Sequence, residues 1–427
     1  MKNRQIFAKI WENIDNQDII LLNGARQVGK TTLLKMIKEK LEKEKNVPAS
    51  NILWFDLEQS TDLEIWRDQT KALSRLPLRS FERHYVFIDE FQLSPTIGST
   101  FKVIHDHYPH IKCLATGSLS WWVTVEESMA GRKRVFNIWP LSFAESINWN
   151  QNESVAKTFR LANNRETVLP SITAAEIEFA NQEMLNYMAY GGYPAVINTA
   201  DEAEKKSLLN ELVDSYIIRD IQHFNRAVDP VQTRKLLMLL ASGSGSLFDI
   251  SRVSTDSELG RAALLNRIGW LEHMFVISLI RPFFTNKIKE LVKNPKIFTN
   301  DPGLRNLLLQ NHSVLPATNE FGQLAENFVA AELLKRENNL SHSLHFWRTK
   351  TGHEVDIVIK SGQNTIPLEI KGGNCENIPS GLAAFIKAYQ PKEAYILNWS
   401  VVKNEKYLDC QIYFRPLWWA SILTETL

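Results

Sequence analysis

The feature that most restricts how this chain folds is a glycine loop, GARQVGKTT, between an apolar segment and a Lys- and Glu-rich segment. Residues 19–22 predict a short buried strand, and residues 30–45 predict a helix. The glycines of the spacing G-x-x-x-x-G-K-T let successive backbone N–H groups point inward, and the following helix adds the positive end of its dipole. We therefore predict a phosphate-binding loop formed by Gly24, Ala25, Arg26, Gln27, Val28, Gly29, Lys30, Thr31 and Thr32.

Two side chains of this loop have the chemistry that a nucleoside triphosphate requires. Lys30 would reach the β- and γ-phosphates, and the hydroxyl of Thr31 would ligate Mg²⁺. An ordinary Gly-rich turn between a strand and a helix would not require Lys and Thr at this spacing. The sequence therefore predicts ATP and Mg²⁺ as cofactors.

A second segment, HYVFIDEFQ, places two acids at the end of an apolar run. Such a run is typical of a buried parallel strand that delivers acids to the C-terminal edge of a sheet. Asp89 would hold Mg²⁺ and Glu90 would polarise the attacking water, since phosphoryl transfer needs charge neutralisation and positioning. Further strands are predicted at residues 51–58, 112–117 and 134–140, which makes the N-terminal region an α/β domain.

Two more residues of this region are candidates for a part in hydrolysis. Thr116, at the end of KCLATG, is suitably placed for a hydroxyl that senses the γ-phosphate or its water. Arg132, in AGRKRVF, is an arginine finger for a neighbouring subunit, a contact within the chain, or a surface cation before a strand. These alternatives stay open, because an arginine finger is recognised by its position in an assembly.

Near the C-terminus, GHEVDIVIKSGQNTIPLEIKGG predicts two strands joined by a Gly-containing turn, with Asp356 on the first. Glu369 and Lys371 share one face of the second strand, because side chains alternate along a strand. An amphipathic helix at residues 321–337 carries Glu326 among its apolar positions. Metal-dependent phosphodiester cleavage needs carboxylates for the cation and a positive charge near the reacting phosphate.

We therefore predict Asp356, Glu369 and Glu326 as ligands of Mg²⁺ or Mn²⁺, with Asp356, Glu369 and Lys371 as catalytic residues. The alternative is an antiparallel hairpin whose charges are ordinary surface decoration. Asp356 argues against this alternative because apolar residues bracket it, as they do Glu369.

The motifs GARQVGKTT, FIDEFQ, ATGS and AGR…PLSF resemble those of a family of AAA-type ATPases of bacteria and archaea. That family joins an ATPase domain to a C-terminal domain of unknown function, which is similar to the PD-(D/E)xK restriction-endonuclease-like superfamily. The resemblance covers nearly the whole chain. It implies a P-loop sheet with strand order 5-1-4-3-2, a helical winged-helix-like middle and a C-terminal α/β nuclease-like domain. A winged helix binds DNA or serves as a packing unit, and both readings stay open.

The chain is therefore expected to have four parts. They are an ATPase domain at 1–150, a polar linker or insertion at 151–182, a winged-helix-like domain at 183–315 and a nuclease-like domain at 316–427. Lys and Arg total 49 and Asp and Glu total 48, so the net charge of +1 shows no overall attraction to nucleic acid. Three widely spaced cysteines and the lack of a long apolar run predict a cytoplasmic protein without a membrane partner.

The expected function is an ATP-hydrolysing protein that acts on DNA, with metal-dependent nuclease activity in its C-terminal domain. One alternative is an ATP-switched DNA-binding or regulatory protein whose nuclease-like domain is inactive. Another is a signalling ATPase that grips a protein partner, which the near-zero net charge favours. A homo-oligomer is compatible with each of these expectations.

Overall fold

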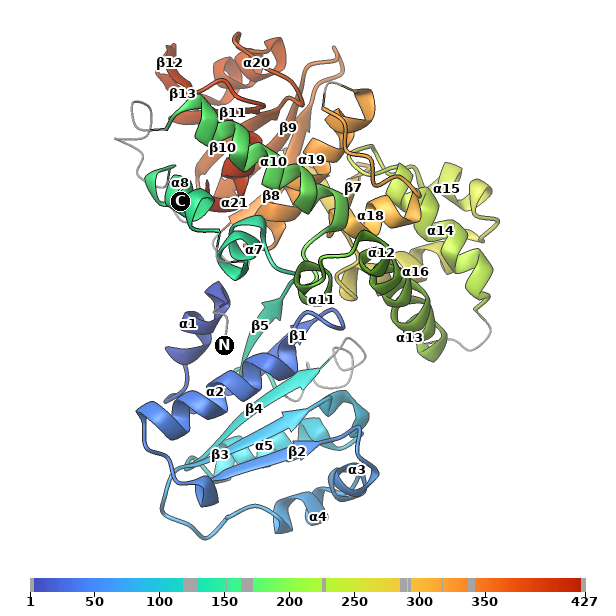
Figure 1. The fold of residues 1–427 in the computed structure, drawn as a ribbon. Helices are drawn as coiled ribbons and strands as arrows, with labels where there is room; N and C mark the ends of the chain where they lie inside the picture. The colour runs from blue at the N-terminus through green and yellow to red at the C-terminus, as the bar shows by residue number, and fades with distance from the viewer. Residues whose placement is uncertain are drawn as a thin grey trace. The chain divides into compact units, whose positions relative to one another are not determined.

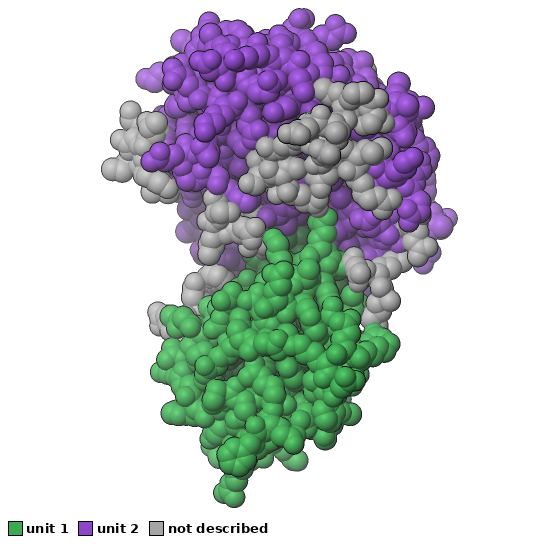
Figure 2. Space-filling view, turned by 90° about the vertical axis from the view of Figure 1, so that its left-hand side faces the viewer, with its two compact units in different colours: residues 1–139 green, residues 140–427 purple. Residues whose placement is uncertain are grey.

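The structure, a computed structural model, describes residues 4–117, 129–150, 152–162, 172–224, 228–284, 290, 293–316, 318–336 and 342–423 (Figure 1). The chain divides into two compact units, residues 1–139 and 140–427 (Figure 2). This division differs from the sequence-based boundary at residue 150. The reason is that α7 (Phe143–Trp149) contributes buried side chains to the core of the second unit.

The first unit is built on a parallel sheet. Its strands are β1 (Ile19–Gly24), β2 (Ile52–Asp56), β3 (His84–Asp89), β4 (Ile111–Gly117) and β5 (Lys133–Ile138). They pair in the order β2-β3-β4-β1-β5, and every pairing is parallel. Every residue of β1, β3 and β4 is buried, as expected for central strands of a parallel sheet. The predicted strand order 5-1-4-3-2 is confirmed.

The helices of the first unit follow the sequence pattern. They are α1 (Gln5–Trp11), α2 (Lys30–Glu44), η1 (Ala49–Asn51), α3 (Ser60–Trp66), α4 (Gln69–Ser74), η2 (Phe91–Leu93) and α5 (Ile97–His107). In α2 the buried residues Leu33, Leu34, Ile37 and Leu41 recur at helical spacing, so one stripe faces the core. On its exposed side, Lys–Glu pairs four residues apart support the helix.

The second unit contains a mixed sheet that crosses two of the predicted domains. Its strands are β6 (Ile277–Pro282), β7 (Lys296–Thr299), β8 (His342–Arg348), β9 (Glu354–Ser361), β10 (Asn364–Ile370), β11 (Glu393–Asn398), β12 (Lys403–Tyr407) and β13 (Cys410–Pro416). The order is β12-β13-β11-β10-β9-β8-β6-β7. β9 and β10 form the predicted antiparallel hairpin, and β11 runs parallel to β10. The pairing of β6 with β8 joins the predicted middle domain to the predicted C-terminal domain.

The second unit also contains helices, several of which contribute side chains to the core beside the sheet. They are α7, α8 (Glu153–Ala162), α10 (Ala174–Tyr190), α11 (Pro194–Asn198), α12 (Glu202–Glu211), η4 (Leu212–Ile217), α13 (Ile218–Phe224), α14 (Pro230–Ser242), α15 (Ile250–Asp256), α16 (Arg261–His273), α18 (Pro302–Leu308), α19 (Asn319–Leu334), α20 (Ser380–Tyr389), η5 (Leu417–Trp419) and α21 (Ala420–Leu423). The expected linker at 151–182 includes α8, whose Val155 and Phe159 are buried in the same core as α19. The structure therefore gives this segment a packing role that its polar composition concealed.

A buried ionic network holds the segment that begins the second unit. Glu332 and Lys335 of α19 form an ion pair at 2.9 Å with side chains only 0% and 3% exposed. Glu332 Oε2 accepts a hydrogen bond from the backbone N–H of Phe143 at 2.8 Å. The hydroxyl of Tyr187 lies 3.0 Å from Glu332 Oε1 and 2.6 Å from the carbonyl oxygen of Leu141. Residues 141–143 are thus fixed to α10 and α19 by buried groups.

Candidate functional site

The glycine loop connects β1 to α2, as predicted, and its two glycines are required by the local backbone. A Cβ on Gly24 would collide with the carbonyl oxygen of Ile138 on the neighbouring strand β5. Gly29 has φ of +93°, a left-handed conformation that side chains disfavour, and α2 begins directly after it. Lys30 is 5% exposed, and its Nζ donates to the carbonyl oxygens of Gly24 and Ala25 at 3.0 and 2.8 Å. The ammonium group therefore lies against the loop that is predicted to hold phosphates.

The acids predicted from HYVFIDEFQ lie at the same edge of the sheet. Asp89 is the last residue of β3, and its carboxylate accepts a hydrogen bond from the hydroxyl of Thr116 on β4. That hydroxyl also accepts a hydrogen bond from the backbone N–H of Glu90 at 3.2 Å. The Glu90 carboxylate accepts in turn from the side-chain amide of Gln92. Because β3, β4 and β1 are neighbours with parallel C-terminal ends, the tertiary structure brings Thr116 and both acids to the edge where the loop begins.

Arg4 is a contact of the glycine loop that the sequence did not reveal. Arg4 is 8% exposed, and its guanidinium donates to the carbonyl oxygens of Val28 at 2.9 Å and Trp139 at 2.8 Å. It thus connects the loop to the last residue of the first unit. No local pattern distinguishes this arginine from the other charges of the N-terminal segment, because both of its partners are distant in sequence.

The same edge of the sheet carries two acids that the sequence analysis did not single out, Asp56 at the end of β2 and Glu58 just after it. Burial raises the pKa of Glu58, and the negative charges of Glu90 and Asp56 add to the effect, while Arg26 opposes it. The sequence contained a signal for these acids. The predicted strand at residues 51–58 ends in the letters DLE, so it carries acids at its end, as the strand that ends in Asp89 does.

Arg132 lies at the opposite end of the sheet. Its carbonyl oxygen accepts from the N–H of Ile19, the first residue of β1, whereas the glycine loop follows the last residue of that strand. At about 3.3 Å per residue these ends are roughly 16 Å apart. Its guanidinium pairs with Asp106, at 2.7 Å between Nε and Oδ1, and holds the pKa of that carboxyl well below its usual range. Of the readings left open, the structure shows the contact within the chain, and Arg132 is remote from its own chain's loop.

The C-terminal candidates gather into a cluster, which we call the acidic cluster. Its members are Glu326 of α19, Glu354 and Asp356 of β9, Glu369 of β10, Lys371, and Lys296 of β7. Lys371 Nζ lies 2.7 Å from Glu369 Oε1, and Asp356 Oδ2 accepts from the N–H of Ile370 at 2.7 Å. The four residues predicted for this site are thus brought together, and the sequence analysis missed Lys296 and Glu354. Glu354 could have been predicted from the sequence EVD. It lies two residues before Asp356, so both side chains are expected on the same face of the strand.

In this structure a lysine ammonium lies among the carboxylates of the acidic cluster. In the part of the chain that the structure describes, no group of three or more His, Cys, Asp or Glu side chains is arranged to hold a metal ion. Lys296 Nζ instead lies 2.7 Å from Glu326 Oε1 and 2.6 Å from Glu354 Oε1. Glu326, Asp356 and Glu369, the expected ligands, therefore share a cluster without converging on one ion position.

Glu369 provides a pH-dependent test of this cluster. Burial raises its pKa from the ordinary 4.5 to about 7, the charge of Asp356 adds to the effect, and Lys371 opposes it. The folded protein therefore keeps a proton on Glu369 that the unfolded chain has released. This contribution to stability is fully present below pH 4.5 and is lost as the pH rises through 7.

We expect Glu369→Gln, which cannot ionise, to gain stability relative to the natural protein by on the order of 2 kcal/mol between pH 5 and pH 8. Urea unfolding of both proteins at the two pH values measures this difference. The exposed Glu376→Gln is the matched control and should show no such trend. Equal pH dependence in all three proteins would contradict the raised pKa.

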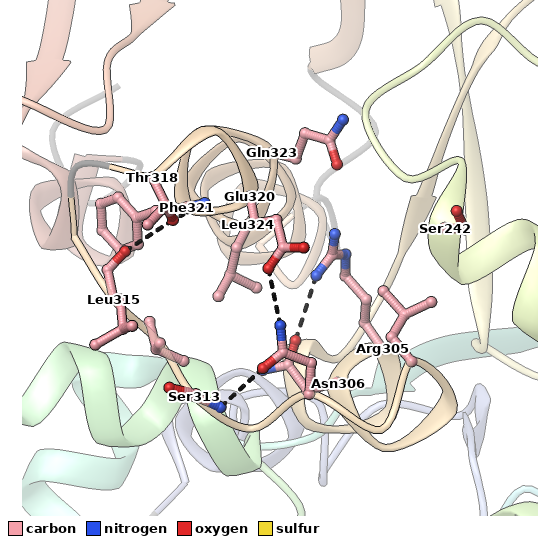
Figure 3. Close-up of a pocket in the computed structure, with 13 residues that line it drawn as sticks. Ser242, Arg305, Asn306, Ser313, Leu315, Thr318, Glu320, Phe321, Gln323 and Leu324 are labelled. Carbon is pink, nitrogen blue, oxygen red and sulfur yellow. Dashed lines mark hydrogen bonds between the residues drawn. The ribbon is translucent and has the colours of Figure 1, made fainter.

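A separate cavity of about 270 Å³ lies among residues of α14, α18 and α19. Figure 3 shows Arg305 and Asn306 on one side of it and Glu320 on another. Arg305 is 6% exposed and donates to Asn306 Oδ1 at 3.3 Å, while Glu320 accepts from Asn311 at 2.9 Å. None of the residues predicted for a site lines this cavity.

Comparison with known families identifies the first unit. Residues 16–147 match the family described as an AAA domain, and this match contains the glycine loop and the acids of β3. The first unit is a P-loop AAA domain. In the second unit, residues 181–314 match a domain of unknown function (DUF8612) and residues 321–411 match another (DUF4143). The nuclease-like character of the C-terminal region is not part of these descriptions.

Two relatives that match most of this chain are described only as uncharacterised proteins. An uncharacterised protein of Haemophilus influenzae is 24% identical over 333 residues, which cover 75% of this chain and 76% of the relative. An uncharacterised protein of Methanocaldococcus jannaschii is 24% identical over 365 residues, which cover 83% of this chain and 76% of the relative. The similarity therefore extends beyond the AAA domain into the second unit.

Matches to solved structures have low overall similarity. The ORC2 protein of Aeropyrum pernix in its ADP form is 12% identical, covers 64% of this chain and 84% of its own, and has a TM-score of 0.30. The clamp loader delta protein of Bacillus subtilis is 11% identical, covers 76% of this chain and 99% of its own, and has a TM-score of 0.25. Scores of this size do not define a shared overall fold. None of the described helices combines the length and apolar character needed to span a lipid bilayer.

Proposed function

We propose that this chain hydrolyses ATP in its AAA domain and uses that reaction to act on DNA. The observation that carries the first part is the placement of Lys30, Asp89 and Thr116 at one edge of the parallel sheet. The loop offers backbone N–H groups and the N-terminus of α2, and the Lys30 ammonium now rests on carbonyl oxygens that phosphate oxygens would replace. These residues fit a triphosphate with Mg²⁺.

Each residue of the AAA site has a distinct part in this proposal. Thr31 and Asp89 would hold Mg²⁺, which supplies charge neutralisation at the phosphates when bound. Lys30 would contact the β- and γ-phosphates. Thr116 orients Asp89 by its hydrogen bond, and Glu90, held by Gln92, would polarise the attacking water. Glu58, just after β2, lies close enough to Glu90 and Asp89 for their charges to raise its pKa further, after burial.

Topology supports the second part of the proposal, action on DNA. Helices α14, α15 and α16 precede the β6–β7 hairpin, and Leu247 forms an isolated antiparallel bridge to Lys296 of β7. This is the order of a winged helix, a fold that inserts a helix into the major groove of DNA. Arg252 of α15 and Arg261 of α16 are exposed, and both are candidates for contacts with DNA phosphates.

The experiment that tests the proposal is ATP hydrolysis by the full chain with and without duplex DNA, from 50 to 200 mM salt. We expect DNA to stimulate hydrolysis and the stimulation to fall steeply with salt, because phosphate contacts release counterions. The variant Arg252→Ala/Arg261→Ala should weaken the stimulation without changing the basal rate. If the rate of ATP hydrolysis is the same with and without DNA at every salt concentration, the result would favour the alternative of a signalling ATPase with a protein partner.

A second candidate function is metal-dependent phosphodiester cleavage by the C-terminal region. The order α19, β8, β9, β10, α20, β11 is that of a restriction-endonuclease-like core, and Asp356, Glu369 and Lys371 lie together within it. Nicking of supercoiled plasmid with Mg²⁺ or Mn²⁺, with and without ATP, tests it beside Asp356→Ala and Lys371→Ala. Cleavage that both variants lose would support it. No cleavage with intact ATP hydrolysis would leave an ATP-switched DNA-binding protein with an inert nuclease-like fold.

A further inference from the structure

Lys296 is a buried cation inside the acidic cluster. The residue is 4% exposed, and its Nζ contacts Glu326 Oε1 at 2.7 Å and Glu354 Oε1 at 2.6 Å. The ring centroid of Phe346 lies 5.5 Å from the same atom. An ammonium group without water is stable in such a place only when carboxylates compensate its charge. Here two carboxylates do so at once.

The surrounding charges keep this lysine protonated. Burial by itself would lower the pKa of Lys296, but the charges of Glu326, Asp356 and Glu354 outweigh it and leave the pKa above its ordinary value. A permanent positive charge therefore lies where several acids of the cluster meet. A divalent cation would need the same carboxylate oxygens, because hard cations bind through oxygen ligands.

The position of Lys296 is built by more than one element. Three residues further along β7, the N–H of Thr299 donates to Ser244 Oγ at 3.0 Å and to Asn327 Oδ1 at 2.9 Å. Ser244 lies in the tip after α14, and Asn327 follows Glu326 on α19. In the same tip, a Cβ on Gly245 would come within 3.1 Å of Glu326 Oε2. Hydrogen bonds therefore hold β7, which carries Lys296, against α19, which carries Glu326.

The lysine and the acids belong to different family regions. Lys296 lies in the region matched at 181–314, whereas Glu326, Glu354, Asp356 and Glu369 all lie in the region matched at 321–411. β7 is also the last strand in the order of the sheet, and among the described residues it pairs with β6 and, through one bridge, with Leu247. A shift of this edge strand would therefore withdraw the cation without opening the centre of the sheet.

We propose that Lys296 is an internal cation in the place of a divalent metal, through which the DUF8612 region keeps the acidic cluster of the DUF4143 region closed to metal ions. The inference rests on the nuclease-like character proposed for the C-terminal region. While Lys296 is in place, its ammonium group forms ion pairs with the carboxylates of Glu326 and Glu354. Asp356 and Glu369 are the two acids of the cluster that form no ion pair with Lys296 in the structure. Removing the positive charge releases Glu326 and increases the net negative charge of the cluster by one.

Binding of Mn²⁺ to the nucleotide-free full chain tests this proposal, read by electron paramagnetic resonance or calorimetry. We expect Lys296→Met to bind one Mn²⁺ at least tenfold more tightly than the natural protein. Lys360→Met removes a half-buried lysine of β9 outside the cluster and should leave the affinity unchanged. Adding Asp356→Asn to Lys296→Met should abolish the gain, which assigns the new site to the acidic cluster.

A folded Lys296→Met protein that binds Mn²⁺ no better than the natural protein would overturn the proposal. Because Lys296 is buried, Lys296→Gln is a second variant that keeps a hydrogen-bond donor between the carboxylates. Its melting temperature should rise with added Mn²⁺ more than that of the natural protein, and equal shifts would also overturn the proposal. The readout is independent of ATP hydrolysis and of DNA cleavage, so failure of those functions is distinguishable from failure here.

Discussion

Lys30→Ala is expected to lower the rate of ATP hydrolysis by about 100-fold or more while the protein stays folded. Removing one preorganised charge from a site where negative charge develops commonly costs a factor of this size. Lys30 is the buried ammonium of the glycine loop and has no second lysine beside it in the loop. Release of inorganic phosphate under steady-state conditions measures the effect.

The matched control is Lys43→Ala on the same helix. Lys43 is 72% exposed and pairs with Glu39, so its loss should leave hydrolysis unchanged. Thermal unfolding of both variants separates a catalytic effect from a folding defect. Normal hydrolysis by folded Lys30→Ala would overturn the assignment of the glycine loop as the ATP site. The affinity of the C-terminal acidic cluster for Mn²⁺ should be the same in both variants.

Glu332→Ala is expected to destabilise the second unit by about 3–5 kcal/mol, the cost of leaving one partner of a buried ion pair without the other. Glu332 is completely buried, and its removal leaves the ammonium of Lys335 and the N–H of Phe143 without their carboxylate. Because the network holds residues 141–143, we also expect faster proteolysis near the start of the unit. Urea unfolding measures the first effect, and limited proteolysis measures the second.

The exposed Glu320→Ala, on the same helix α19, is the control for this prediction. It loses a hydrogen bond with Asn311 at the surface and should cost less than about 1 kcal/mol. Glu332→Gln, which keeps an acceptor for the N–H of Phe143, should lie between the two. Equal stability of Glu332→Ala and Glu320→Ala would contradict the buried network.

The AAA domain was predictable because its signals are local. The spacing of Gly24, Gly29 and Lys30 describes a loop whose conformation depends on residues within it and on the strand and helix that flank it. The apolar run before Asp89 likewise predicts a buried strand that ends in an acid. The order of the strands, which the family resemblance supplied, then brings Thr116 beside Asp89.

The second unit was less predictable because its partners are distant. Residues 151–182 read as a polar linker, yet Val155 and Phe159 contribute to a core that they share with η5 and α19. The predicted domain border between residues 315 and 316 does not divide the sheet. β6, which precedes the border, pairs with β8, which follows it. Covering the edge of β8 in this way removes unpaired backbone groups that would otherwise face solvent.

The sequence by itself determined the phosphate-binding loop, the acids of β3 and the hairpin that carries Asp356 and Glu369, because these depend on spacing along a few residues. Only the tertiary structure decided that Arg132 lies far from its own loop, that Arg4 contacts Val28 and that Lys296 enters the acidic cluster. The physical reason is that a buried charge is stable only beside its counter-charge or hydrogen-bond acceptors, and long-range packing chooses those partners.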